Sequence, residues 1–327
     1  MINISETLLK AGKTLYAEKK TTEAIECFHQ SIKSNPDNRE AHIHLAYALC
    51  RSGDYENGFK EFVWVWKPVF GDQTNLLSKE KKLNGKTILL SADAGLGDTI
   101  MFSRFSKELS ARNCRVILHV QKPLVRLLQQ SRLADLIISH DEVLPAHDLR
   151  IPFHNLMAAL DIGNSLSSDG NYNYLSCAAE DVAYYEKTIH NQGRRKVGLC
   201  WQGNPDFIDD KIRSVSLEYL LKWTHSNDYI VSLVPNLPND KTKDITSFSF
   251  KDIAQTAALI KNLDIVYTVD TMICHLCGAL GVPAVLLNRF NGCWRWGESS
   301  EKSIWYQSVK IKHQQQFRNW EIDIQNI

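Results

Sequence analysis

The spacing of apolar positions changes along the chain and divides it into a front part and a longer remainder. Residues 5–38 and 39–72 repeat one pattern of apolar and small residues at a period of 34, which predicts pairs of helices. From residue 86 onward, short apolar runs of strand length alternate with segments of helical period. This alternation predicts parallel sheets with helices on both faces. The expected fold class is α/β, preceded by a small all-α region.

The predicted elements give four segments. Residues 1–70 form the helical region and 71–85 a polar, charged linker. Residues 86–190 form a first Rossmann-like lobe, and residues 191–327 form a second one. We expect a cleft between the two lobes. The strands are predicted at 87–91, 116–120, 136–139, 149–153, 197–201, 229–234, 263–269, 284–287 and 309–312, and the main helices at 99–112, 180–191, 217–223, 252–262 and 272–280.

The helical region carries the positions of a tetratricopeptide repeat pair, which it resembles. Two units make four helices, fewer than the three or more repeats that a free-standing solenoid usually needs. We therefore expect the apolar run at 62–66 to pack on the next domain or on another subunit. Two interpretations stay open: a helical brace, or a docking surface for a polypeptide partner. The matching positions are Leu8, Gly12, Ala24, Phe28 and Pro36 in the first unit, and Leu45, Ala46, Gly58 and Phe62 in the second.

The segment from Asn262 to Asn288 organises the second lobe. It is expected to form a buried strand, a helix from Met272 that ends at Gly281, and a second parallel strand. Asp270 or Thr271 could cap the helix. Ligands of open α/β sheets bind at the carboxyl ends of the strands, and a helix start attracts anions. This segment therefore predicts a site for an anion, most simply a phosphate.

Composition narrows the range of partners and compartments. The chain has 327 residues and a formal net charge of +1, which gives no support for a nucleic-acid surface. The first residues lack the apolar core of a signal peptide, and no apolar run has the length of a membrane span. Eight cysteines are scattered without the spacing of a disulfide framework. We expect a cytoplasmic protein with reduced thiols, no nucleic-acid partner and no membrane span.

Five short motifs occur in order, and together they give a resemblance to a known family. The chain is similar to the tetratricopeptide-linked glycosyltransferases related to the ADP-heptose transferases. The resemblance implies the two-lobed GT-B fold, a nucleotide-sugar donor on the second lobe and an acceptor on the first. The motifs are Gly95-Leu96-Gly97-Asp98-Thr99, Trp201-Gln202-Gly203-Asn204-Pro205 with Arg213-Ser214, Val269-Asp270-Thr271 with His275, Gly278-Ala279-Leu280-Gly281, and Trp294-Arg295-Trp296.

On the acceptor side, Asp98 is the candidate catalytic residue. Glycosyl transfer needs a base for the acceptor hydroxyl, and the matching aspartate of the family has that role. The alternative is a plain helix-capping carboxylate. Gly95 and Gly97 form the acceptor-side loop around it. Relatives commonly carry glutamate and glutamine where this chain has Asp93 and Ala94, a departure that bears on the expected acceptor geometry and activity.

On the donor side, the candidates are cations and helix-start groups that would stabilise a departing diphosphate. Arg213 is the first candidate for the diphosphate charge and Lys211 the second. His275 is either a donor contact or a buried, hydrogen-bonded histidine. Trp294 and Trp296 could stack on a base or sugar, or pack in the core. The remaining donor-side candidates are Asn204, which would shape the donor loop, and Asp270, Thr271 and Met272, which would offer cap and backbone donors to phosphate.

The cysteines of the second lobe allow a further hypothesis. Cys274 and Cys277 lie on one helix face, and with Cys293 and His313 they could form a four-ligand metal site. Relatives usually carry small residues at positions 274 and 277, although some autotransporter heptosyltransferases hold a cysteine-bound iron. Buried thiols or a redox pair are the alternatives. Our expectation is that no metal or cofactor is required, with the nucleotide sugar as substrate.

The expected function is an inverting glycosyltransferase that moves a sugar from ADP-heptose or a similar donor to an acceptor. The repeats suggest a polypeptide acceptor, and the exposed repeat ends make a homo-oligomer plausible. The alternatives are an acceptor of lipopolysaccharide-core type, and a catalytically silent scaffold whose repeats bind a partner.

Overall fold

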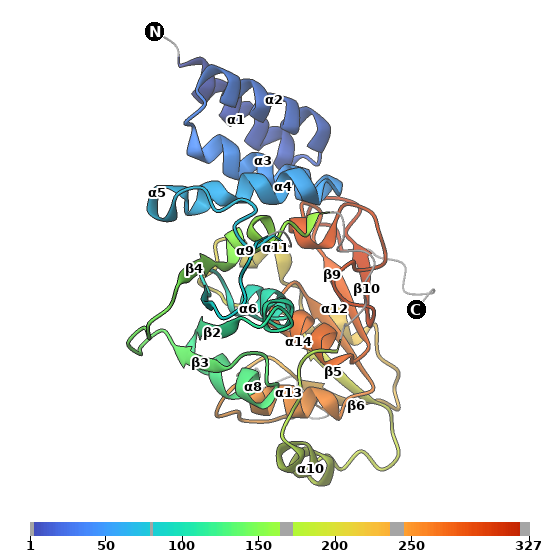
Figure 1. The fold of residues 1–327 in the computed structure, drawn as a ribbon. Helices are drawn as coiled ribbons and strands as arrows, with labels where there is room; N and C mark the ends of the chain where they lie inside the picture. The colour runs from blue at the N-terminus through green and yellow to red at the C-terminus, as the bar shows by residue number, and fades with distance from the viewer. Residues whose placement is uncertain (1–2, 79–80, 164–172, 236–244, 321–327) are drawn as a thin grey trace.

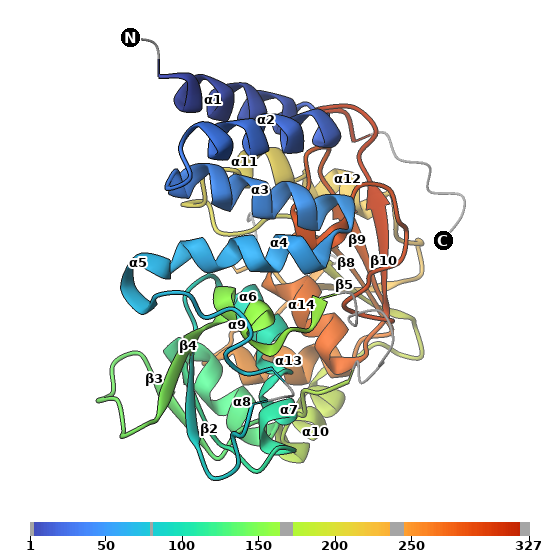
Figure 2. The same ribbon diagram turned by 45° about the horizontal axis from the view of Figure 1, so that its top comes forward.

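The computed structural model describes residues 3–78, 81–163, 173–235 and 245–320 (Figure 1). The described chain begins with helices that stack side by side on one end of the molecule (Figures 1 and 2). Successive helices pack against each other, so each predicted repeat is a pair of helices. Their assignment as tetratricopeptide repeats stays a prediction. The helices are α1 (Ile4–Ala17), α2 (Thr21–Ser34), α3 (Arg39–Ser52) and α4 (Tyr55–Phe62), followed by η1 (Val63–Val65) and α5 (Lys67–Phe70).

The first lobe is a four-stranded parallel sheet in the order β3-β2-β1-β4. Three of its strands are buried over most of their length, as expected for a sheet covered by helices. The lobe contains β1 (Thr87–Ser91), β2 (Arg115–Val120), β3 (Leu136–Ser139) and β4 (Leu149–Pro152), with α6 (Leu96–Ser103), α7 (Ser106–Ser110), η2 (Lys122–Leu124), α8 (Val125–Gln130) and α9 (Phe153–Leu160).

The helix predicted at 99–112 differs from the structure in two ways. It is divided into α6 and α7, and it begins three residues earlier, at Leu96. Gly95 lies in the extended region at the N-cap, and the Asp98 carboxylate accepts a hydrogen bond from the Gly95 backbone N–H (3.0 Å). This contact satisfies a donor that the helix start leaves free. Gly97 and Asp98 are therefore part of the first turn of α6 rather than of the loop before it.

The second lobe is a six-stranded parallel sheet in the order β10-β9-β8-β5-β6-β7. The three-residue strand β7 was not predicted, because three residues are too few to show a period. The helix predicted at 272–280 is confirmed, and Gly281 ends it with a φ of 72°. The lobe contains β5 (Lys196–Cys200), β6 (Tyr229–Ser232), β7 (Ile245–Ser247), β8 (Ile265–Val269), β9 (Ala284–Asn288) and β10 (Val309–His313), with α11 (Asp210–Arg213), α12 (Leu217–Leu221), α13 (Ile253–Lys261), α14 (Met272–Leu280) and η4 (Trp294–Trp296), and α10 (Ala179–Thr188) precedes it.

The predicted α/β fold with two parallel-sheet lobes is confirmed, but the parts share one core. One continuous cluster of buried side chains includes Phe62 of α4 together with residues of both lobes. Leu77 and Leu83, in the segment predicted as a linker, are buried in the same cluster. Between the lobes, α6 packs on α14 and α8 on α13, and the first pair lies together in both views (Figures 1 and 2). The lobes therefore meet over an extended area.

Among the residues that the structure describes, no helix combines the length and the apolar character that a membrane span needs. The polar composition of residues 161–173 predicts a loop, and most of this segment lies outside the described residues.

Candidate functional site

The two lobes meet where the first turn of α6 faces the first turn of α14. Asp98 lies in the former, and Asp270, Thr271 and Met272 lead into the latter. Both helices follow the carboxyl ends of parallel strands, β1 and β8. Ligands of open α/β sheets bind at this edge. The sequence-predicted acceptor side and donor side are thus brought together.

The start of α14 leaves backbone donors unpaired. Thr271 is the N-cap, and its hydroxyl accepts from the Ile273 N–H (3.2 Å). Asp270 does not cap the helix but accepts a hydrogen bond from the indole N–H of Trp296 (2.8 Å). Within the described residues, the backbone N–H groups of Thr271 and Met272 have no hydrogen-bond partner. Such free donors at a helix start are suited to an anion.

Arg213 is held beside this helix start by two hydrogen bonds. Its Nε donates to Asp210 Oδ1 (2.8 Å), and its Nη1 donates to the backbone carbonyl of Asp270 (2.9 Å). Asp210 also accepts from the Gly203 N–H (3.2 Å) and from the Ser214 hydroxyl (3.1 Å), so the carboxylate itself is fixed. In the described part of the chain, Nη2 of Arg213 has no hydrogen-bond partner. A fixed guanidinium with one free amino group is a suitable contact for a phosphate oxygen.

Asp98 is paired across the lobe boundary with Arg295 of η4. Arg295 Nη2 contacts Asp98 Oδ1, and Nη1 donates to Cys293 Sγ (2.7 Å). The Asp98 side chain keeps 19% of its surface exposed. Burial acts to lower the pKa of the Arg295 guanidinium, but Asp98, Cys293 and Asp270 outweigh it, so the pKa lies above its ordinary value. Arg295 therefore stays charged.

His275 is buried behind the first turn of α14. Its Nδ1 hydrogen-bonds with the Tyr306 hydroxyl (2.9 Å), and its ring lies 5.1 Å from that of Trp296, centroid to centroid. Burial lowers the pKa of His275 to about 4, so the ring is neutral at pH 7. The donor contact proposed for His275 stays a prediction, and these contacts match the alternative of a buried, hydrogen-bonded histidine.

The structure leaves two predicted donor residues on the surface. Asn204 is exposed, and its side chain accepts from the Asp206 N–H (3.1 Å) in a local turn. Lys211 is exposed and makes no ion pair with another described residue.

Trp294 and Trp296 are buried in the core, at 3% and 2% exposure, rather than presented to a ligand. The candidates brought together are Gly95, Gly97, Asp98, Arg213, Asp270, Thr271 and Met272.

The four proposed metal ligands do not converge. Cys274 and Cys277 are fully buried, and burial raises the pKa of both thiols. Cys293 contacts Arg295, whereas His313 lies against the Ser300 carbonyl (3.0 Å). Among the described residues, no group of three or more His, Cys, Asp or Glu side chains is placed to hold a metal ion.

Sequence reasoning missed several residues at this site. Asp210 could have been found, because it lies three residues before Arg213 on the same helical turn. Arg295 belongs to the Trp294-Arg295-Trp296 motif, but no sequence pattern assigned it a role, since its partner Asp98 is remote from it in sequence. Asp93 was also missed: it accepts hydrogen bonds from the His154 ring (2.9 Å) and from the Trp66 indole of the helical region.

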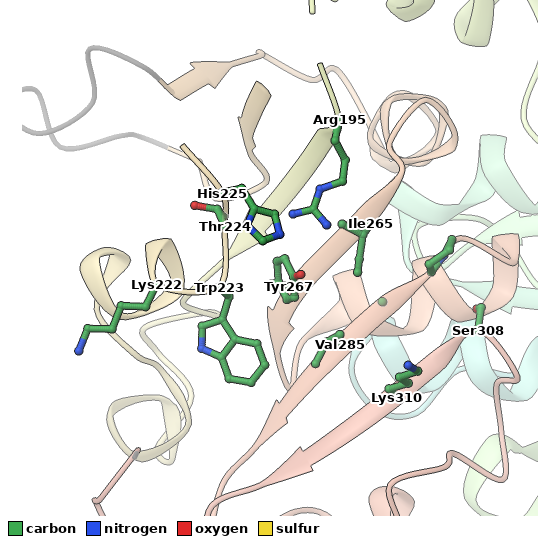
Figure 3. A pocket seen from close by; sticks show the side chains of 12 residues that line it. Arg195, Lys222, Trp223, Thr224, His225, Ile265, Tyr267, Val285, Ser308 and Lys310 are labelled. Carbon is green, nitrogen blue, oxygen red and sulfur yellow. The ribbon is translucent and has the colours of Figure 1, made fainter. Parts of the chain in front are cut away.

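A separate cavity of about 480 Å³ lies at the opposite edge of the second sheet (Figure 3). Its floor includes Tyr267, Val285 and Lys310, which are neighbours in register on β8, β9 and β10. Arg195 and His225 form part of its rim (Figure 3). The cavity is at the amino ends of these strands, so it is distinct from the site around Asp98 and Arg213.

Comparisons with known proteins give structural neighbours. The glycosyl transferase of family 9 from Veillonella parvula has 11% sequence identity and a TM-score of 0.53, over 72% of this chain and 87% of that chain. The Escherichia coli ADP-heptose lipopolysaccharide heptosyltransferase II has 13% identity and a TM-score of 0.48, over 72% and 92%. The iron-containing dodecameric glycosyltransferase TibC from enterotoxigenic E. coli has 13% identity and a TM-score of 0.46, over 64% and 60%.

No protein-family model and no curated protein sequence matches the chain. The likeness to the Veillonella structure, at 11% identity, shows a shared fold and no more.

Proposed function

We propose that this protein is a glycosyltransferase that moves a sugar from a nucleotide-sugar donor on the second lobe to an acceptor on the first. The observation that carries the proposal is the arrangement of Arg213. Two of its nitrogens are fixed by Asp210 and by the carbonyl of Asp270, the residue just before the start of α14, and its third nitrogen, like the N–H groups of Thr271 and Met272, has no hydrogen-bond partner among the described residues. This arrangement suits the diphosphate of a nucleotide sugar.

The chemistry of the two sides is complementary. Transfer releases a nucleoside diphosphate, whose developing negative charge Arg213 and the start of α14 would stabilise. Asp98, on the facing lobe, would accept the proton of the acceptor hydroxyl. In this proposal the positive charge comes from protein groups, and inversion follows from a single displacement at the sugar carbon. Asn204, Lys211 and His275 stay candidates for donor contacts.

The proposed donor is ADP-heptose or a similar nucleotide sugar, and the proposed acceptor is a polypeptide. The acceptor proposal is supported by the place of the helical region, whose Trp66 reaches Asp93 at the carboxyl end of β1. An acceptor of lipopolysaccharide-core type keeps the same chemistry, and a silent scaffold is the non-enzymatic alternative. A cytoplasmic location and a homo-oligomeric state belong to the same proposal.

The test is a thermal-shift screen with nucleotides and nucleotide sugars, including ADP-heptose, UDP-glucose and UDP-N-acetylglucosamine. A ligand at a hundred times its Kd adds about 2.7 kcal/mol to the free energy of unfolding. We expect a shift with the wild type that is lost in Arg213→Ala. Arg195→Ala is the matched control, because Arg195 also bonds an aspartate, Asp228, but at the other end of β5.

We expect the Arg195→Ala variant to keep the full shift. A wild-type protein that responds to none of the nucleotides would favour the scaffold. A shift that survives in Arg213→Ala would show that the diphosphate binds elsewhere.

A further inference from the structure

Arg295 is the residue at this site that the sequence motifs singled out and the proposed function has not used. It lies in the Trp294-Arg295-Trp296 turn of the second lobe and reaches Asp98 of the first lobe. Its position is fixed, since its backbone carbonyl accepts from the Trp305 indole (2.8 Å) and its guanidinium lies 4.5 Å from the Trp294 ring centroid. The side chain is 12% exposed.

The hydrogen bonding of Arg295 differs from that of a structural arginine nearby. Arg104, also at the lobe boundary, donates from Nε and Nη1 to the carbonyls of Met101 (3.0 Å) and Trp305 (2.8 Å), and from Nη2 to the Tyr174 hydroxyl (3.4 Å). All three of its nitrogens have partners. In Arg295, Nε is buried without a hydrogen-bond partner among the described residues.

Such an arrangement is a poor source of stability. A buried ion pair gains little over apolar packing of the same volume, and a buried donor without a partner adds a desolvation cost that nothing offsets. Besides the Cys293 sulfur, the guanidinium bonds the one carboxylate proposed to accept a proton. An arginine at this position is therefore better explained by an effect on Asp98 than by an effect on folding.

The geometry at Asp98 shows what that effect would be. The Gly95 N–H holds Oδ2, and Arg295 holds Oδ1. An ionised carboxylate has about four acceptor positions, so two contacts leave others for an acceptor hydroxyl. The remaining 19% exposure of the side chain gives access to them. Because Arg295 belongs to the donor lobe, the carboxylate has this orientation only when the two lobes are in contact.

We propose that Arg295 is a positioning residue for glycosyl transfer, which holds the Asp98 carboxylate in a fixed orientation toward the acceptor hydroxyl. The inference rests on the proposed function. In the step, the acceptor oxygen forms a bond to the sugar carbon while the bond from that carbon to the diphosphate breaks. The diphosphate leaves with the electron pair, and the acceptor proton passes to Asp98. Arg295 itself exchanges no proton.

The experiment compares Arg295→Lys, Arg295→Gln, Asp98→Asn and the double variant Asp98→Asn/Arg295→Gln in the full chain. The assay measures nucleoside diphosphate released from the nucleotide sugar that shifts the wild-type melting temperature most, chosen among ADP-heptose, UDP-glucose and UDP-N-acetylglucosamine, with water as acceptor. Arg126→Gln is the matched control, because Arg126 of the first lobe also joins the lobes, through Asp252 of the second (2.6 Å), and it pairs with Asp181 as well (2.5 Å).

We expect Arg295→Gln to lower kcat by about 100-fold while the KM for the donor stays within about threefold of the wild type. A misplaced base slows the chemical step but does not weaken donor binding. Arg295→Lys should have a kcat about tenfold higher than that of Arg295→Gln, because lysine restores the positive charge but not the planar array of N–H donors of the guanidinium. The double variant should be no slower than Asp98→Asn alone, since the two residues act as a unit. Arg126→Gln should stay within about twofold of the wild type, because its ion pair lies away from Asp98.

Three results would overturn the inference: wild-type kcat in Arg295→Gln, additive losses in the double variant, or an equal loss in Arg126→Gln. If Arg295→Gln does not fold, the test uses Arg295→Lys instead. A lysine variant that folds and shows wild-type kcat also overturns the inference. A wild type without turnover and without any nucleotide shift overturns the proposed function and this inference with it. An active wild type matched by Arg295→Gln overturns the inference alone.

Discussion

His275 shows how a single buried residue links stability to pH. It has 4% exposure, a hydrogen bond to Tyr306 and a position against the first turn of α6. Burial lowers the pKa of His275 from 6.5 to about 4, whereas the unfolded chain restores the ordinary value. Protons therefore bind the unfolded state more tightly than the folded state between these values.

We predict that the free energy of unfolding falls as pH falls below 6.5. The neutral His275 ring contributes to the free energy of unfolding in full above pH 6.5, and this contribution is lost as pH approaches 4. Between pH 7.5 and pH 5 the free energy of unfolding should fall by roughly 2 kcal/mol on this account. Urea unfolding of the wild type and of His275→Gln at several pH values measures it. The free energy of unfolding of the variant should depend less steeply on pH, because glutamine cannot bind the proton that His275 takes up in the unfolded chain.

The comparison isolates His275, because His44, His119 and His313, whose pKa values are also lowered by burial, are kept in both proteins. Identical pH dependence in the wild type and the variant would contradict the prediction. An NMR titration in which the His275 ring takes up its proton near pH 6.5 would do the same.

At the scale of elements, the contact between α6 and α14 depends on a close approach at Gly97. A Cβ at this position would lie 2.6 Å from Cδ2 of His275, a ring held by Tyr306 on its other side. At Gly95, two residues earlier, a Cβ would lie 3.3 Å from Asp98 Oδ2, and the backbone is extended, so a shift of a few tenths of an ångström at that carboxylate would admit a side chain.

We therefore predict that Gly97→Ala destabilises the protein by about 1–3 kcal/mol, as overpacking does, and moves α6 away from α14. Gly95→Ala is the matched control and should cost less than about 1 kcal/mol. Chemical denaturation of the two variants measures the difference. Equal stabilities would show that α6 has no close contact with α14 in solution.

The same two helices show what the sequence can and cannot predict. The β8–α14–β9 unit was found to within two residues at each end, because its strands are mostly apolar and Thr271 and Gly281 are strong end signals. The start of α6 was placed too late, because a glycine N-cap gives no side-chain signal and Asp98 caps from inside the helix. The pairing of Asp98 with Arg295 depends on how the lobes meet, which no local pattern contains.

At the scale of the whole molecule, the helical region contacts both lobes. Arg51 of α3 bonds Glu298 of the second lobe (3.2 Å), and Trp66 bonds Asp93 of the first. Burial raises the pKa of Tyr47 on α3, and Arg295 and Asp98 lie near enough to act on that pKa as well. The helical region therefore lies beside the proposed catalytic pair, and both interpretations of it, a brace and a docking surface for the polypeptide acceptor, agree with these contacts.

The first helix pair is less involved than the second. Leu9, Ala24 and Phe28 belong to a separate buried cluster shared with part of α3. Phe59, Phe62 and Val63 belong to the core that continues into both lobes. Phe62, for example, lies with its ring centroid 5.4 Å from that of Trp294 and 5.8 Å from that of His154. Removal of α1 and α2 should therefore destabilise the lobes less than removal of the whole helical region.

We predict a single cooperative thermal transition for the full chain, because one core joins the helical region to both lobes. Residues 39–327 should still fold, whereas residues 69–327 should not, since the second truncation strips several large side chains from the shared core at about 3–5 kcal/mol each. Calorimetry and far-UV circular dichroism of the three proteins measure this. If residues 69–327 melt cooperatively at the wild-type temperature and keep their nucleotide shift, the helical region is an independent docking module, and the contacts of Arg51 and Trp66 contribute little to the fold.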